Sequence, residues 1–445
     1  MGTTAPSAIL TGTRRAVRIV LQVLAVVAFI TILLVRHGPP SGGDTPSITA
    51  PSVALAQGHL QAAATAAVLP SPPGYALLTA AAIFAFRPLI GESTWCTPPA
   101  AMPRRATPDP FPSAAERAGE CGAFATSSST GEGAGPLPPW YRSQATVAIL
   151  AWVVMALGAI SLLRAAGIEP GWPEIGLTWA MAILPAASNS IVQLFHPQDL
   201  LCLGLALAAL AEVLRRRWVA AGLLFGLAMA TKQFAILILI PSLVAVPTWR
   251  ARGRVLATGA AIAGVIVAPF FAVAPRRTFD DAVGIGAAGA VRGATVIGQL
   301  NVSSGVESAL ARGVPIAFAV LVCLWALRRT RVAELSPVQV IGLVLACLAG
   351  RLVFESVIIP YYLLATSVVI LVLDLAGRRL PSRSLAWIAC SAAFVAVDPR
   401  RAWLDAAVTL ALALIAVAIG LHDYCAGSPG AASSELDASP MTRIA

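Results

Sequence analysis

Charged residues are scarce in this sequence, and lysine is almost absent from it. Only 12% of the 445 residues are charged, 58% are apolar, and Lys232 is the single lysine. The mean hydropathy is +0.80. A water-soluble chain of this length cannot bury so much apolar surface in one core. The composition therefore excludes a soluble globular protein and indicates that lipid surrounds much of the chain.

Metal-binding patterns are missing as well. The seven cysteines form no CxxC or Cys/His spacing. No DxD-type acidic pair is present that would hold a divalent ion against a nucleotide sugar. We therefore expect neither a metal nor another cofactor. Cys202, Cys323, Cys347 and Cys390 fall in apolar segments, where a small buried thiol is the ordinary interpretation.

The net charge of +10 does not indicate a nucleic-acid partner. The aromatic or helical reading elements of RNA- and DNA-binding modules are absent. The basic residues instead form short clusters between apolar runs, which is the positive-inside pattern of membrane proteins. These clusters are Arg14–Arg15, Arg215–Arg217, Arg250–Arg254, Arg328–Arg331 and Arg378–Arg383.

Twelve apolar segments are candidates to cross a hydrocarbon layer of about 30 Å. They predict an all-α polytopic protein in the plasma membrane, with the lipid bilayer as a partner. A cytoplasmic N-terminus would place every later arginine cluster inside. The first segment is expected to be an uncleaved span, because the A-x-A match that follows it, Ala54-Leu55-Ala56, lies far beyond it. The segments are residues 17–35, 144–164, 172–187, 198–214, 218–231, 234–247, 255–274, 312–328, 336–354, 357–374, 384–398 and 402–421.

A large outer loop is predicted between the first two spans, at residues 36–143. Its apolar stretch from Pro73 to Ile90 is treated as interfacial or re-entrant, because a span there would move every later arginine cluster outside. The loop also holds a helical stretch from Ser52 to Val68. Its portion from Thr97 to Pro139 is rich in Pro, Gly and Ser, which predicts irregular structure.

The rest of the chain forms one transmembrane domain, residues 1–425. Residues 275–311 are a second outer loop, and residues 426–445 are a polar cytoplasmic tail that we expect to be disordered. Two pairs of segments are separated by very short turns. Such turns place irregular backbone at membrane depth, which is tolerated only where it lines a protein cavity. They therefore indicate a site.

The polar side chains that are costly to bury in a membrane collect on the predicted outer side. Ionisable groups in such places are functional candidates. Lys232 lies inside an apolar run, and arginine supplies every other side-chain cation except histidine. We therefore interpret Lys232 as a functional candidate and not only as a marker of membrane topology. The candidates are Asp44, His196, Asp199, Lys232, Gln233, Arg351, Glu355, Tyr361 and Tyr362.

Several of these residues also have a purely structural interpretation. Asp44 lies in Ser-Gly-Gly-Asp-Thr-Pro and could be a turn residue or helix cap. His196-Pro197-Gln198-Asp199 could simply begin a helix. Lys232 could extend to the outer headgroups.

The remaining candidates are open in the same way. Arg351 and Glu355 stand four apart on one helical face and could form a structural ion pair. Tyr361 and Tyr362 could belong to an interfacial aromatic belt.

Three segments give the chain a resemblance to a known family. They are HPQDLLCLGLALAALAEVLRRRWVAAGLLFGLAMATKQFAILILIPSL, the segment from Arg351 to Tyr362, and an early outer-loop acid followed by GHL and SPPGYALLTA. Together they resemble the actinobacterial membrane glycosyltransferases of family 87, which have the C-superfamily fold and use polyprenyl-phosphate mannose. The resemblance extends over about residues 40–375, and the insert at 91–139 has no counterpart.

The resemblance implies an inverting, metal-independent sugar transfer at the outer leaflet. Asp44 matches the outer-loop aspartate that serves as general base, which takes the proton of the attacking hydroxyl. The polyprenyl phosphate that leaves gains negative charge, and fixed cations at His196, Lys232 and Arg351 would stabilise it. The residues expected to bind the substrates are His59, Tyr75, Asp199, Gln233, Glu355, Tyr361 and Tyr362.

Other functions remain open at the level of the sequence. A transporter or flippase of lipid-linked sugars would also need many spans and buried charge, but its key residues are expected near the midplane. A non-catalytic envelope assembly protein is a further alternative. The acceptor could be a glycolipid, a polysaccharide or a protein, and mannose is implied only by the resemblance.

Two cysteines flank the Pro-rich insert of the outer loop. Cys96 and Cys121 would face an oxidising compartment in the predicted topology. We therefore expect a disulfide between them.

Overall fold

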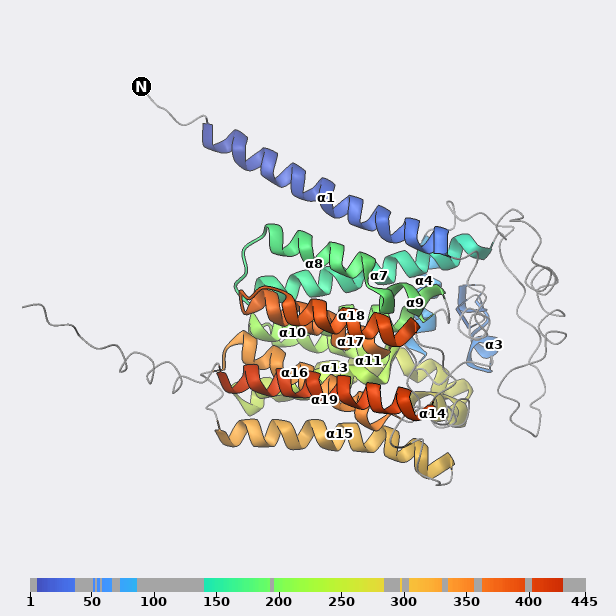
Figure 1. Ribbon diagram of the computed structural model, residues 1–445. Coiled ribbons are helices and arrows are strands. Elements are labelled where there is room, and N and C mark those ends of the chain that lie inside the picture. The colour runs from blue at the N-terminus through green and yellow to red at the C-terminus, as the bar shows by residue number, and fades with distance from the viewer. Residues whose placement is uncertain are drawn as a thin grey trace, which may run out of the picture.

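The fold is a bundle of helices (Figure 1). In the computed structural model, every regular element of the described residues is helical, which confirms the predicted all-α polytopic class. The structure describes residues 6–36, 51–52, 54–56, 58–65, 73–85, 140–192, 196–283, 297, 304–329, 335–355, 362–396 and 402–426. Asp44, Tyr361, Cys96 and Cys121 lie outside these ranges, so their predicted roles are carried forward as predictions.

All twelve predicted segments are mainly helical. Within the described residues, seven helices are long and apolar enough to cross a membrane, and α11, η2 with α12, and α17 are shorter apolar helices. The bounds are α1 (Pro6–Arg36), α7 (Trp140–Ala165), α8 (Trp172–Ile183), α9 (Pro185–Val192), α10 (Pro197–Leu214), α11 (Trp218–Thr231), η2 (Gln233–Ala235), α12 (Ile236–Val244), α13 (Trp249–Val273), α15 (Ser304–Arg329), α16 (Pro337–Phe354), α17 (Leu363–Ala376), α18 (Ser382–Ala396) and α19 (Ala402–Ala426).

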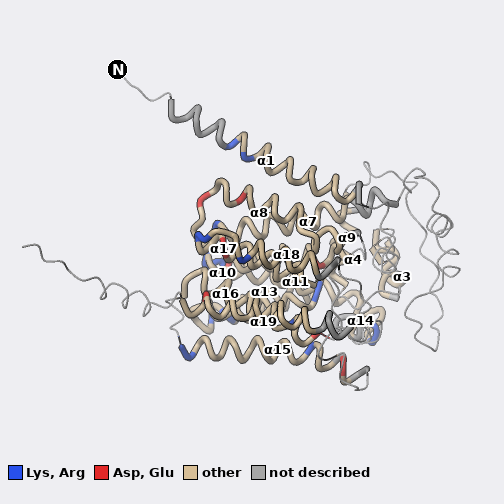
Figure 2. Tube along the Cα trace, in the orientation of Figure 1, with Lys and Arg blue, Asp and Glu red and all other residues tan. Residues whose placement is uncertain are grey.

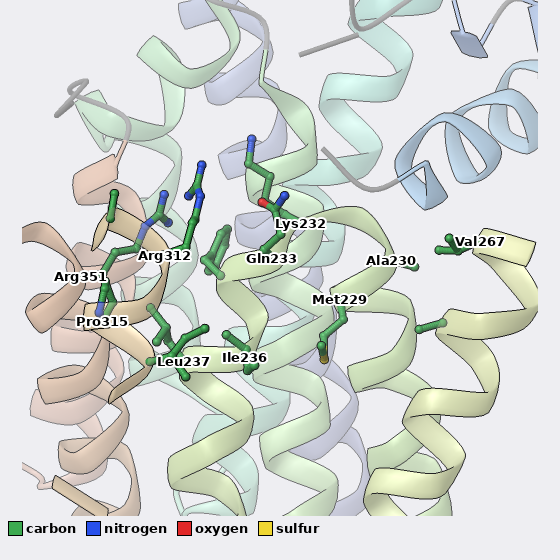
Figure 3. A pocket seen from close by; sticks show the side chains of 14 residues that line it. Met229, Ala230, Lys232, Gln233, Ile236, Leu237, Val267, Arg312, Pro315 and Arg351 are labelled. Carbon is green, nitrogen blue, oxygen red and sulfur yellow. The ribbon is translucent and has the colours of Figure 1, made fainter. Parts of the chain in front are cut away.

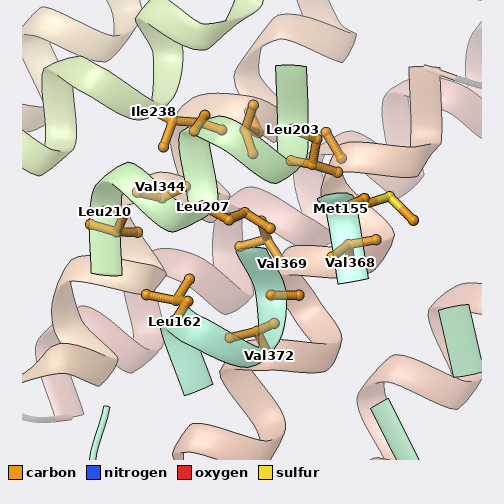
Figure 4. Packing of buried hydrophobic residues seen from close by; sticks show 14 of the residues in the cluster. Met155, Leu162, Leu203, Leu207, Leu210, Ile238, Val344, Val368, Val369 and Val372 are labelled. Carbon is orange, nitrogen blue, oxygen red and sulfur yellow. The ribbon is translucent and has the colours of Figure 1, made fainter. Parts of the chain in front are cut away.

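Glycines allow the central helices to approach each other closely. A Cβ on Gly158 of α7 would lie 2.1 Å from the carbonyl oxygen of Gly204 on α10. A Cβ on Gly420 of α19 would lie 2.4 Å from the carbonyl oxygen of Gly342 on α16. Small residues at such crossings bring backbones together, which is how membrane helices gain packing contacts. Around these crossings the aliphatic core fills with side chains from α7, α10, α12, α16 and α17 (Figure 4).

One predicted segment, residues 172–187, is broken in the structure. α8 ends at Ile183, Leu184 is extended with ψ 118, and α9 begins at Pro185. Proline has no N–H and disfavours helical backbone in the residue before it, which explains the break. The short α9 then brings Ser190 against His196, and the backbone N–H of His196 donates to the Ser190 carbonyl at 2.6 Å.

A second break separates α11 from α12, as the short predicted spans indicated. Lys232 is extended, with φ −158 and ψ 140, and η2 follows it before α12. The Lys232 N–H still donates to the Ala228 carbonyl of α11 at 3.0 Å. The lysine is therefore held at a fixed point where the helix ends.

Helices α4 (Gly74–Ala85) and α3 (Leu60–Thr65) belong to the predicted outer loop, and α4 packs near this break. α4 contacts α7, α11 and α13, and a Cβ on Gly74 would lie 2.4 Å from the carbonyl oxygen of Ala230, near the end of α11. α3 contacts α13 and α14 (Pro275–Val283). The apolar stretch after Pro73 therefore packs against other helices as α4. The position of α4 relative to the bilayer stays a prediction.

Buried acids neutralise part of the predicted inner arginine clusters. Arg383 donates to Asp374 through Nε at 2.7 Å and to Asp423 through Nη2 at 2.9 Å, and Arg379 donates to Asp423 at 2.5 Å. Arg164 pairs with the buried Glu174. Figure 2 shows several of these charged segments toward the left end of the bundle.

The cysteines of the apolar segments fall into two groups. Cys202, Cys323 and Cys347 are buried as predicted. The prediction was wrong for Cys390, which is exposed on α18. An apolar helix face that borders lipid accepts a thiol as readily as the core does, so the sequence pattern does not separate the two.

Candidate active site

The candidate site lies where α11 ends, beside the first turn of α10 and against α15 and α16. A cavity of about 360 Å³ opens there. Lys232, Gln233, Arg312 and Arg351 form its polar part, and the nitrogen ends of Lys232, Arg312 and Arg351 point to the same side (Figure 3). The apolar wall is formed by Met229, Ala230, Phe234, Ile236, Leu237, Ala263, Val267, Ala311, Pro315 and Ile316.

Lys232 is buried and lies beside an acid from another helix. Its Nζ is 3.8 Å from Oδ1 of Asp199, and the two side chains are 11% and 7% exposed. Cys202 packs beneath the turn, with its Sγ 3.5 Å from the Lys232 carbonyl oxygen. A lysine that only extends to headgroups needs no buried counter-ion, so this geometry argues against a purely interfacial role.

His196 immediately precedes α10 and contacts the same acid. Its Nδ1 lies 3.5 Å from Oδ2 of Asp199 and 2.9 Å from Nε2 of Gln198. α10 begins at Pro197, with Asp199 in its first turn, so these residues do begin a helix, as the structural interpretation proposed. The helix start and the cation cluster are formed by the same residues.

Arg351 and Glu355 form the ion pair that their spacing indicated. Arg351 Nε donates to Oε2 of Glu355 at 2.6 Å. The guanidinium also lies over two aromatic rings, 4.7 Å from the centroid of Tyr362 and 5.4 Å from that of Phe234. Cation–π contacts and a buried carboxylate fix the arginine in one orientation.

Arg312 is a member of this site that the sequence analysis missed. It lies on α15, lines the cavity, and its Nη1 is 3.5 Å from Oε1 of Glu355. A signal was present, because Arg312 stands at the predicted outer end of a span, away from the inner arginine clusters. Phe234, which follows Gln233, was also missed because an apolar residue in an apolar segment gives no signal.

Two predicted substrate-binding residues, His59 and Tyr75, are not part of the cavity lining. His59 is exposed in a turn, where its N–H donates to the Ala54 carbonyl at 2.8 Å. Tyr75 is buried in α4, and burial raises the pKa of its hydroxyl well above the usual value, so this hydroxyl stays protonated. Neither is among the described residues that line the cavity.

The charges of the cluster suit an anion. Three cations, Lys232, Arg312 and Arg351, face two carboxylates, Asp199 and Glu355, so one positive charge is in excess before His196 is counted. Within the described ranges, no group of three or more His, Cys, Asp or Glu side chains could hold a metal ion. The arrangement can therefore bind a singly charged phosphate diester through its own side chains.

Residues 136–354 match the sequence model of glycosyltransferase family 87. The match covers just under half of the chain, and it makes this segment similar to a family of membrane glycosyltransferases. The matched segment contains five of the clustered residues, which are His196, Asp199, Lys232, Arg312 and Arg351. Together with the apolar helices, it makes the chain a multi-pass membrane protein. No curated protein matches the chain.

Proposed function

We propose that this protein transfers a sugar, mannose in the first instance, from a polyprenyl-phosphate donor to a glycolipid or cell-envelope polysaccharide. The observation that carries the proposal is the cavity itself, which combines a cationic end with an apolar wall. A lipid-linked sugar phosphate has the same two parts. A nucleotide sugar has no apolar chain to occupy the wall.

The cationic end supports binding of the donor phosphate. The donor is a phosphate diester with one negative charge, and the leaving polyprenyl phosphate is a monoester that can carry two. Lys232, Arg351 and His196 would bind these oxygens and stabilise the developing charge without a metal. Asp199 and Glu355, predicted to bind substrate, are each paired with these cations, which favours a positioning role for both.

The apolar wall supports binding of the isoprenoid chain. Leu237 lies on one side of the cavity and Val267 of α13 on the other, with Met229 between them (Figure 3). α13 and α15 are poorly covered by protein, with 11% and 28% of their apolar windows buried. Their surroundings are therefore lipid in a membrane, and a polyprenyl chain can extend from the cavity into the bilayer.

The reaction that we propose is a single displacement. The acceptor hydroxyl loses its proton to the Asp44 carboxylate, its oxygen bonds to the anomeric carbon, and the bond from that carbon to the phosphate oxygen breaks with inversion. Gln233 and Tyr362, together with His59, Tyr75 and Tyr361, would contact the sugar or acceptor.

We also propose that the protein lies in the plasma membrane with its site at the outer leaflet, because the arginine clusters occupy the opposite end of the bundle.

The experiment that tests this function is sugar transfer by the purified protein in lipid nanodiscs. Polyprenyl-phosphate mannose should be consumed, with release of polyprenyl phosphate detected by mass spectrometry, whereas nucleotide sugars should not. Asp44→Asn keeps the shape and most of the capping ability of the side chain but removes its basicity. We expect at least a ~10²-fold loss of turnover in a folded protein.

The matched control is Asp109→Asn, which removes another acid of the same outer loop. It should keep normal turnover. Near-normal transfer by Asp44→Asn would contradict the base assignment. Movement of intact donor across the bilayer without bond cleavage would instead indicate a flippase.

A further inference from the structure

Arg351 and Arg312 both contact the buried carboxylate of Glu355 at the cavity, and Arg351 contacts it more closely. Glu355 is 3% exposed and accepts from Arg351 at 2.6 Å, whereas Arg312 lies 3.5 Å away at the other carboxylate oxygen. Arg351 is 11% exposed and Arg312 is 29% exposed. Glu355 is therefore neutralised mainly by Arg351, and Arg312 is the more weakly held cation.

The segment that carries Arg312 is separated from the rest of α15 by a proline. α15 begins at Ser304 and contains Pro315, three residues after Arg312. Proline has no N–H to donate to the carbonyl of residue 311 and crowds the preceding turn, which kinks a helix. The bend near this end of α15 is visible in Figure 1. The turn with Arg312 is therefore less tightly tied to the helix than a continuous α15 would make it.

A purely structural role does not account for Arg312. One arginine already satisfies the charge of Glu355, and a second cation beside a largely apolar cavity costs desolvation without full compensation. An anion that enters the cavity would supply that compensation. Arg312 therefore supplies the excess positive charge of the cluster and is also the more exposed of the two arginines.

We infer that Arg312 determines the specificity of the donor site for a phosphate-bearing lipid. In the empty site Glu355 holds its guanidinium, and on binding the guanidinium leaves Glu355 to donate to the phosphate. Glu355 thus acts as a positioning residue that competes with the phosphate. This inference rests on the proposed lipid-phosphate donor.

The experiment compares binding of undecaprenyl phosphate with binding of uncharged undecaprenol. Purified full-length protein in detergent micelles is titrated with each lipid, and binding is followed by native mass spectrometry and by the shift in Tm. Arg312→Gln should bind the phosphate lipid at least about tenfold more weakly, the loss expected for one charge-assisted hydrogen bond. Its binding of undecaprenol should not change.

Glu355→Gln distinguishes a competing carboxylate from a structural pair. If Glu355 competes with the phosphate, this variant should bind undecaprenyl phosphate more tightly than the wild type, and its Tm should rise more on binding. If the pair is only structural, both variants lose stability together and keep the wild-type ratio of affinities. Arg328→Gln, an exposed arginine in the last turn of the same helix, is the matched control and should behave as the wild type.

The outcomes separate this inference from the proposed function. If the wild type prefers the phosphate lipid and Arg312→Gln keeps that preference, the inference is overturned while the donor class stands. If the wild type shows no preference for the phosphate lipid, the proposed donor class fails and the inference fails with it.

Discussion

Lys232 and Asp199 join two helix ends at the candidate site, with Lys232 Nζ 3.8 Å from Asp199 Oδ1. The lysine stands in the extended residue after α11, and the aspartate lies in the first turn of α10. Both side chains are nearly buried, so the contact compensates part of the charge of each. The contact therefore links the position of a cation at the cavity to the packing of the bundle.

Asp199→Asn should destabilise the protein strongly, because it removes the carboxylate charge beside the buried Lys232 and His196. We expect a loss of about 3 kcal/mol in the free energy of unfolding, the size typical of a broken buried pair. Asp199→Asn combined with Lys232→Met should be less destabilised than the single aspartate variant. Thermal unfolding in detergent measures all of these proteins, and purely additive effects would show that the two residues are not coupled.

Lys232→Met should weaken use of the lipid donor. The substitution keeps the length of the side chain and removes its charge, so we expect the KM for the donor to rise roughly 10- to 100-fold. Lys232→Arg keeps the charge and should retain most of the affinity. An unchanged KM in a folded Lys232→Met protein would remove the lysine from the donor site.

The predicted topology places residues 36–143 outside the cytoplasm. A single cysteine introduced as Ser128→Cys should react with a membrane-impermeant thiol reagent in intact cells, because only that placement puts the arginine clusters inside. Ser382→Cys, at the first residue of α18, is the matched inner control and should react only after the cells are opened. The reverse pattern would invert the assignment of the site to the outer side.

Cys96 and Cys121 should be joined by a disulfide in protein purified without reductant. Such a bridge would stabilise the fold by about 3 kcal/mol in the chain-entropy description. Mass spectrometry of the unreduced peptides identifies the link. Recovery of both thiols in free form would contradict the prediction and with it the oxidising environment of the loop.

The helical class and the positions of most apolar helices followed from the sequence alone, although residues 172–187 form two helices and α14 lies in the predicted second outer loop. Long apolar runs in lipid must satisfy their own backbone hydrogen bonds, so the runs that contain α7, α10 and α16 had to be helices. Lys232 could also be named as a candidate site residue without a structure, because it is a single lysine in an apolar run. The sequence left open that it extends to the outer headgroups instead.

Only the tertiary structure decided which distant residues meet. Lys232 and Asp199 are 33 positions apart, and Arg312 and Glu355 are 43 positions apart, yet each pair shares one contact across two elements. Such pairings depend on how helices cross, which is set by packing at glycines such as Gly158 and Gly204 and not by local propensity. The position of Arg312 at the predicted outer end of a span was a signal, but its contact with Glu355 and its place at the cavity exist only once α15 packs against α16.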